Sequence, residues 1–275
     1  MRALAELVMR GRRYAIGASM VGASIPFLNW LSTAIVSLVV LRKGAAEGSI
    51  VLLWALLPLY FVGGPMPVIA LVGTVIMAYI LRVTLSWELA IAVAVIASAI
   101  GSLVFEYTAA DLLVMLVEFY VKFFKQNSIE VSSELARKAI VGNYAMGQAC
   151  GMCALLVLAR WWQSQLYNPG GFQKEFHQIR LTPWFSTGVV VAMMFSFVFD
   201  EQLGRWIRLL TVPLFFAGIA LVHWTFGFRK MSMNWLIAFY ILLIILSNLI
   251  YPIVASLALM DSYLNLRQRI QTKKV

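Results

Sequence analysis

Long apolar stretches run through this chain and limit most narrowly what it can fold into. Apolar residues make up 62% of the sequence and charged residues only 12%, against roughly 25% charged in soluble domains. A helix crosses the hydrocarbon core of a bilayer with about 20 residues. Stretches of about that length lie near 15–41, 86–105, 140–162, 184–199, 207–226 and 233–258. This pattern predicts an all-α polytopic membrane protein and excludes a cytosolic enzyme, a secreted disulfide scaffold and a disordered chain.

One further apolar stretch, 49–81, is interrupted by Val62-Gly63-Gly64-Pro65-Met66-Pro67. Two glycines and two prolines in six residues are incompatible with a helix interior. We therefore expect two short membrane segments around a turn, which either both cross the bilayer or form a re-entrant hairpin. With this broken hairpin the chain, 1–275, forms a single membrane domain of about eight segments.

The distribution of Lys and Arg predicts the orientation, because these residues gather on the cytoplasmic side. With both termini inside and 49–81 crossing twice or re-entering, 14 lie inside: Arg2, Arg10, Arg12, Arg13, Lys122, Lys125, Arg137, Lys138, Arg205, Arg208, Arg267, Arg269, Lys273 and Lys274. Eight lie outside: Arg42, Lys43, Arg82, Arg160, Lys174, Arg180, Arg229 and Lys230. We expect a bacterial inner-membrane protein with a basic start (1–14) and a basic tail (261–275) in the cytoplasm, and the 163–183 loop outside. The net charge of +10 then meets anionic headgroups, not nucleic acid.

The connection 106–139, expected in the cytoplasm, contains an amphipathic helix. Asp111, Glu118, Lys122 and Lys125 fall on one helical face, and apolar residues cover the rest. Such a helix lies in the membrane interface with its charged face toward water. It can also serve as a docking site for another protein.

Few residues of the sequence are candidates for catalysis, redox chemistry or metal binding. Cys150 and Cys153 form a CxxC pair inside an apolar span, where thiols ionise poorly and pack as small side chains. Only His177 and His223 are available as further soft ligands, too few for a metal site. The sequence has no nucleotide-binding or hydrolase motif, so we expect neither an enzyme nor a cofactor.

The loop 163–183 is the most polar segment. Its Asn168-Pro169-Gly170-Gly171 is a turn signal, and Lys174, His177 and Arg180 are placed to gather an anionic ligand. The alternative is a loop that faces lipid headgroups between tryptophans. Polar residues near the ends of spans are functional candidates, and the predicted ligand-binding residues are Glu88, Arg160, His177, Arg180, His223 and Asn234.

This loop also carries a family resemblance. Asn168-Pro169-Gly170-Gly171-Phe172, Glu175-Phe176 and Arg180-Leu181 resemble the signature loop of the YybS-like family of bacterial membrane proteins. The layout of most of the chain is similar too. That family is grouped by similarity with the substrate-binding S components of energy-coupling-factor (ECF) transporters.

The resemblance implies a protein that binds a small molecule or a lipid headgroup for uptake or sensing. S components dock on a coupling subunit, with a partner ATPase, through an Ala-x-x-x-Ala stripe on their first helix. Ala15, Ser19 and Ala23 match that spacing with Ser in the middle, so they join Asp111, Glu118, Lys122 and Lys125 as candidate docking residues. The alternative function is a membrane scaffold or assembly factor that holds other membrane proteins.

Overall fold

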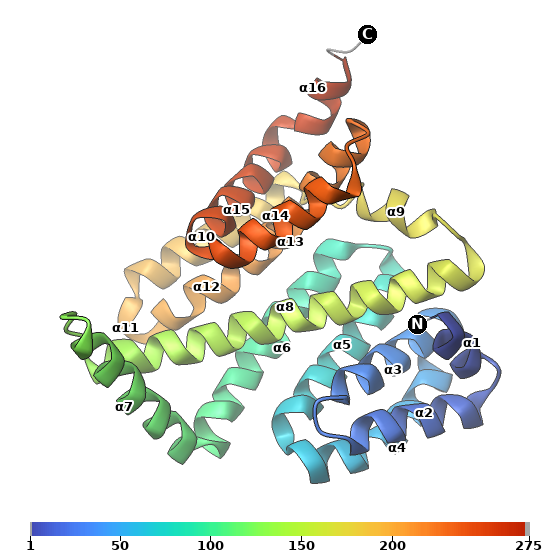
Figure 1. The fold of residues 1–275 in the computed structure, drawn as a ribbon, viewed down its shortest axis with the longest axis horizontal. Coiled ribbons are helices and arrows are strands. Elements are labelled where there is room, and N and C mark those ends of the chain that lie inside the picture. The colour runs from blue at the N-terminus through green and yellow to red at the C-terminus, as the bar shows by residue number, and fades with distance from the viewer. Residues whose placement is uncertain (1, 273–275) are drawn as a thin grey trace.

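The computed structural model describes residues 2–272, which are helical and contain no strand (Figure 1). The elements are α1 (Arg2–Met9), α2 (Arg12–Ser24), α3 (Asn29–Lys43), α4 (Ala45–Gly63), α5 (Pro65–Thr84), α6 (Trp87–Thr108), α7 (Ala110–Gln126), α8 (Ser133–Tyr167), α9 (Gly171–Phe176), α10 (Pro183–Val198), α11 (Asp200–Leu203), η1 (Gly204–Trp206), α12 (Ile207–Leu210), α13 (Val212–Phe228), α14 (Met233–Ile245), α15 (Ser247–Leu264) and α16 (Leu266–Thr272).

Five helical segments are long and apolar enough to cross a membrane: α4, α5, α6, α8 and the run Gly204–Phe228. A sixth is reached if the bent pair α14 and α15 counts as one span. The all-α class compatible with a multi-pass membrane protein is therefore confirmed, whereas the expected count of about eight segments differs from this result. α10 is apolar but has only 16 residues.

The expected first span, 15–41, is two helices. α2 and α3 pack against each other, and a turn at residues 25–28 joins them. Pro26 lies in this turn, where its missing N–H and its ring prevent a continuous helix. Phe27 has a positive φ of 66°, a conformation that reverses the chain direction.

The break expected within 49–81 is confirmed at Gly64. The two segments are not short, however, because α4 has 19 residues and α5 has 20. Each is long enough to cross a bilayer. The stretch 233–258 also differs from the single span expected: α14 and α15 meet at Leu246 with a bend of 119°.

At one end of the bundle α9 lies between α1 and α16 (Figure 1), and Arg267 of α16 contacts the loop that follows α9. We call it the α9 end. Arg82 Nη1 and Gln163 Nε2, at the carboxyl ends of α5 and α8, both donate to the carbonyl of Leu41 near the end of α3. Arg12, at the start of α2, pairs with Glu47 at the start of α4. These contacts fix which helix ends lie together.

The opposite end contains α7, α11 and α12, and we call it the α7 end (Figure 1). Glu106, near the end of α6, accepts hydrogen bonds from Arg137 of α8 and Arg205 of η1. The expected amphipathic helix is confirmed as α7, with its four charged residues Asp111, Glu118, Lys122 and Lys125 all exposed.

These contacts group the loops at the two ends of the bundle differently from the expected arrangement. The turn at 25–28 returns the start of α2 to the α9 end, and the bend at Leu246 returns the end of α15 to it. The loop 163–183 therefore lies at the same end of the bundle as α1 and α16. The connection 106–139 lies at the other end of the bundle.

The small-residue stripe of α2 packs inside the protein. Ala15, Ser19 and Ala23 are each at most 1% exposed, and α2 contacts α3 and α4. This structure therefore leaves no free face at Ala15, Ser19 and Ala23 for a partner helix, which corrects their interpretation as a docking site.

Replacing Ser19 by Leu should destabilise the protein in the absence of any partner. Overpacking a tight core contact costs about 1–3 kcal/mol. Val21, on the same helix, is 61% exposed, so Val21→Leu is the matched control and should leave stability unchanged. Thermal unfolding of the purified variants in detergent measures both. Equal melting temperatures for Ser19→Leu and the parent protein would contradict the internal packing of α2.

Candidate functional site

The loop between α8 and α10 is shaped by a turn and two side-chain hydrogen bonds. Gly170 has a φ of +80°, a conformation that Gly adopts without the steric cost of a Cβ atom. Ser164 Oγ donates to the carbonyl of Asn168 over 2.7 Å and accepts from the backbone N–H of Phe172 over 3.0 Å. The Asn-Pro-Gly-Gly sequence thus reverses the chain and starts α9.

Glu175 of α9 is the point at which the loop is fixed to the bundle. Arg160 of α8 donates to its carboxylate from Nε and from Nη2, the latter over 2.7 Å. Trp87 Nε1, at the start of α6, donates to the same carboxylate over 3.0 Å. Arg160 also donates to Gln163. Bidentate Arg–carboxylate pairs are strong and directional, so they define the position of α9.

Aromatic rings fill the space beneath α9. Trp87 stacks on Phe216 of α13 with ring centroids 5.7 Å apart, and Phe176 meets Phe216 edge-on at 5.9 Å. The other edge of this cluster is His223, whose ring lies 5.2 Å from that of Phe176. The apolar face of α9 therefore rests on α6 and α13, and its polar face points away from the core.

Arg267 of α16 holds the second half of the loop. Its guanidinium donates to the carbonyls of His177 and Ile179 and pairs with Asp261 at 3.1 Å. Arg267 is 8% exposed and Asp261 only 1%. Burial lowers the pKa of Arg267 from its usual value, and the Asp261 carboxylate opposes this effect. A buried charge of this kind is tolerated only when it is paired and hydrogen-bonded.

A basic cleft of about 470 Å³ lies between the loop, α13 and α16. Within residues 2–272, Lys174 has no carboxylate partner, and Arg180 makes one hydrogen bond, from Nη2 to the carbonyl of Ser262 over 3.3 Å. We define the basic cleft by the residues that line it: Lys174, His177, Gln178, Arg180, Trp224, Asn265, Arg267 and Gln271.

His177 separates the basic cleft from a neighbouring one. Burial lowers the pKa of His177 from its usual value, and the charge of Arg267 lowers it further, so both effects favour the neutral imidazole. A Cβ atom on Gly227 of α13 would lie 2.7 Å from His177 Cε1. Glycine at position 227 thus lets the ring approach α13 closely.

The neighbouring cleft has a volume of about 610 Å³ and lies between α8, α9, α13 and α14. Its polar groups include His223 and Tyr240, which share a hydrogen bond of 2.8 Å between Nε2 and the hydroxyl. We call it the apolar cleft, and it is lined by Val157, Trp161, Phe172, Gln173, Phe176, His177, His223, Phe226, Gly227, Met231, Met233, Leu236 and Tyr240.

The structure brings together three of the six predicted ligand-binding residues: His177 and Arg180 line the basic cleft, and His177 and His223 the apolar one. Arg160 is occupied by Glu175, and Glu88 accepts from the backbone N–H and the hydroxyl of Thr182, so both hold the loop in place. Asn234 is exposed at the start of α14 and lines neither cleft.

Sequence reasoning did not include Arg267, which lies about 90 residues beyond the loop and was assigned to the opposite side. Tyr240 was also missed, because one tyrosine in an apolar stretch gives no signal. Among residues 2–272 no group of three or more His, Cys, Asp or Glu is placed to hold a metal ion. Cys153 is 2% exposed and packs in the core of α8.

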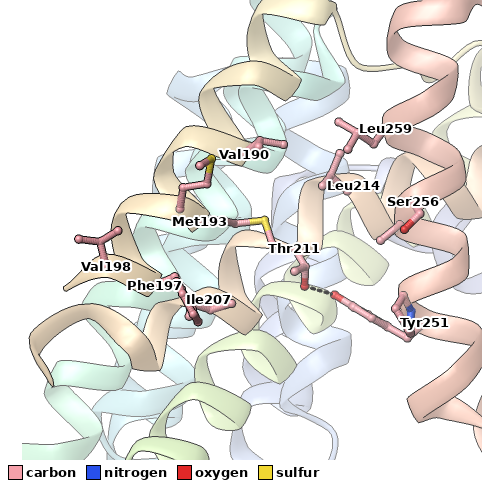
Figure 2. Close-up of a pocket in the computed structure, with 13 residues that line it drawn as sticks. Val190, Met193, Phe197, Val198, Ile207, Thr211, Leu214, Tyr251, Ser256 and Leu259 are labelled. Atoms are coloured by element: carbon pink, nitrogen blue, oxygen red, sulfur yellow. Dashed lines mark hydrogen bonds between the residues drawn. The ribbon is translucent and has the colours of Figure 1, made fainter. Parts of the chain in front are cut away.

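A third hollow, of about 570 Å³, separates α10 from α15 near the start of α13 (Figure 2). Figure 2 shows Val190, Met193 and Phe197 on one side and Leu259 and Tyr251 on the other. The hydroxyl groups of Tyr251 and Thr211 hydrogen-bond to each other over 2.6 Å. No charged residue lines this hollow, so it offers a polar ligand no counter-charge.

No protein-family model, curated protein or solved structure matches this chain.

Replacing Glu175 by Gln should loosen the loop. The change removes the charge that holds Arg160, and hydrogen bonds to charged groups contribute about 1.5–3 kcal/mol. The control is Glu6→Gln, since Glu6 pairs with Arg2 on the exposed surface, where ion pairs contribute about 0–1 kcal/mol. Hydrogen exchange of residues 171–180 reports loop opening. Unchanged exchange in Glu175→Gln would show that Glu175 does not anchor the loop.

Proposed function

We propose that this protein binds a small anionic molecule or a lipid headgroup in the basic cleft. The observation that carries this proposal is the convergence on one cleft of Lys174 and Arg180, from the loop, with Arg267, from a distant part of the chain. His177 in its neutral form adds a hydrogen-bonding group to the cleft, but no positive charge beside those of Lys174 and Arg180. Cations with directional donors in a concave site are the usual means of binding phosphate or carboxylate.

We also propose that the α9 end faces the cytoplasm. Of the described basic residues, 14 lie at this end: Arg2, Arg10, Arg12, Arg13, Arg42, Lys43, Arg82, Arg160, Lys174, Arg180, Arg229, Lys230, Arg267 and Arg269. Six lie at the α7 end: Lys122, Lys125, Arg137, Lys138, Arg205 and Arg208. By the positive-inside rule, this distribution favours a cytoplasmic location for α1, α16 and the loop.

This orientation bears on the resemblance to YybS-like proteins and S components. We retain that relationship as a proposal, supported by the residues of the 163–183 loop. A cleft on the cytoplasmic side receives its ligand from the cytosol or from the inner leaflet. That position favours sensing or lipid binding over capture of a solute for uptake by a coupling subunit and an ATPase.

A scaffold function is the second candidate, and two exposed surfaces favour it. Gly147 and Gly151 of α8 are exposed, and a Cβ atom on either would meet nothing within 4 Å, so a partner helix can approach α8 closely there. On α7, Phe119 is 68% exposed and Phe123 51%. These faces suit another membrane protein or the membrane interface.

Cysteine labelling in intact cells tests the orientation. In a Cys150→Ala and Cys153→Ala background, Gln173→Cys at the α9 end should react with an impermeant reagent only after the membrane is permeabilised. Glu130→Cys, between α7 and α8, should react in intact cells, because both positions are exposed and lie at opposite ends. The reverse pattern would overturn the proposed sidedness.

A binding titration tests the ligand class. The double variant Lys174→Gln with Arg180→Gln removes two positive side chains from the basic cleft. It should weaken binding of glycerol phosphate by about tenfold or more, since hydrogen bonds to charged groups contribute about 1.5–3 kcal/mol. Lys122→Gln with Lys125→Gln is the control, because it removes the same charge at the α7 end. Calorimetry on protein in neutral detergent measures both. Equal affinity in the two double variants would contradict the proposed site.

A further inference from the structure

We infer that the ligand of the basic cleft is an anionic phospholipid, with its headgroup at Lys174 and Arg180 and an acyl chain in the apolar cleft. This inference rests on the proposed function and narrows it from anions in general to an amphiphile. It follows from the juxtaposition of two clefts of opposite character on either side of His177, which lines both.

The two clefts differ in what they offer a ligand. The basic cleft presents cations and amides, whereas Leu236, Met231 and Phe226 contribute apolar surface to the other. The imidazole Nε2 of His223 and the hydroxyl of Tyr240 hydrogen-bond to each other. The apolar cleft therefore offers few unpaired polar groups to a polar ligand. A soluble anion fills only the basic cleft, but a phospholipid fills both.

Two of the helices that line the apolar cleft are candidate membrane spans, which favours a position of the cleft within the membrane. Val157 and Trp161 belong to α8 and His223 to the run Gly204–Phe228, both of which are candidate spans. On the proposed orientation, the cleft lies in the cytoplasmic leaflet, and the basic cleft lies at its headgroup layer. Anionic lipids of that leaflet meet basic residues at this depth.

The helix α14 forms the outer wall of the apolar cleft. It has no buried residue in its 13-residue length, whereas helices of the core bury long apolar faces. Leu236 faces the cleft, and the adjacent Ile237 is 51% exposed. The protein alone covers the apolar side chains of α14 only in part. An acyl chain between α14 and α8 would cover more of them.

The experiment compares a lipid with its headgroup alone. Dioctanoyl phosphatidylglycerol and glycerol phosphate are titrated against the full-length protein in neutral detergent, with dioctanoyl phosphatidylcholine as the zwitterionic comparison. Leu236→Trp fills the apolar cleft, and Ile237→Trp adds the same ring to the exposed face of the same helix. Met231→Trp is a second cleft-filling variant, used if Leu236→Trp does not purify as a monodisperse protein.

We expect phosphatidylglycerol to bind at least about tenfold more tightly than glycerol phosphate, because its chain adds apolar burial. Leu236→Trp should remove this advantage and leave glycerol phosphate binding unchanged, while Ile237→Trp alters neither. Equal affinity of the parent protein for the two probes, or a Leu236→Trp variant that keeps the advantage, would overturn the inference but not the proposed function. Binding of phosphatidylcholine as tight as phosphatidylglycerol would also overturn it.

Loss of the proposed function has a different signature. If Lys174→Gln with Arg180→Gln leaves the affinity for both phosphatidylglycerol and glycerol phosphate unchanged, the basic cleft is not the anion site. The inference then fails with the function on which it rests. The Lys174→Gln and Arg180→Gln double variant tests the proposed function, and Leu236→Trp tests the lipid inference. The two failures are therefore distinguished by which of these variants leaves binding unchanged.

Discussion

Peptide groups inside a bilayer find hydrogen-bond partners only within their own helix, and this constraint governs the whole architecture. Chain reversals belong where polar groups or water can satisfy the backbone, so the helix ends collect at two faces. The α9 end carries the ion pairs of Arg160 and Arg267, and the α7 end those of Glu106. These ion pairs therefore lie at the two faces, and both the basic and the apolar cleft open near the α9 end.

The helical class and the amphipathic α7 were predictable because each has a periodic or compositional signal. The break at Gly64 was equally clear, since glycines and prolines cluster around it. The turn at 25–28 and the bend at Leu246 were missed because each lies within a long, mainly apolar stretch. Pro26 was the clearest signal in the first case and Ser247-Asn248 in the second.

Missing a single reversal has a large effect on sidedness. Each undetected turn moves everything on one side of it to the opposite end of the expected arrangement. The first missed reversal changed the end at which α1 was expected relative to the loop, and the second changed the end expected for α16. The candidate site was affected in the same way. His177, Arg180 and His223 were selected from local composition and line the clefts, whereas Arg267 was expected far from the loop and so was not assigned to the basic cleft.

The contact between Arg267 and the loop has a consequence for biosynthesis. The carbonyls of His177 and Ile179 leave the ribosome well before Arg267 does, and synthesis proceeds at about 5–20 residues per second. For that interval of several seconds the second half of the loop lacks its guanidinium partner, and the basic cleft lacks one wall. The basic cleft is therefore completed only as α16 docks, so a nascent chain can insert into the membrane before this cleft has formed.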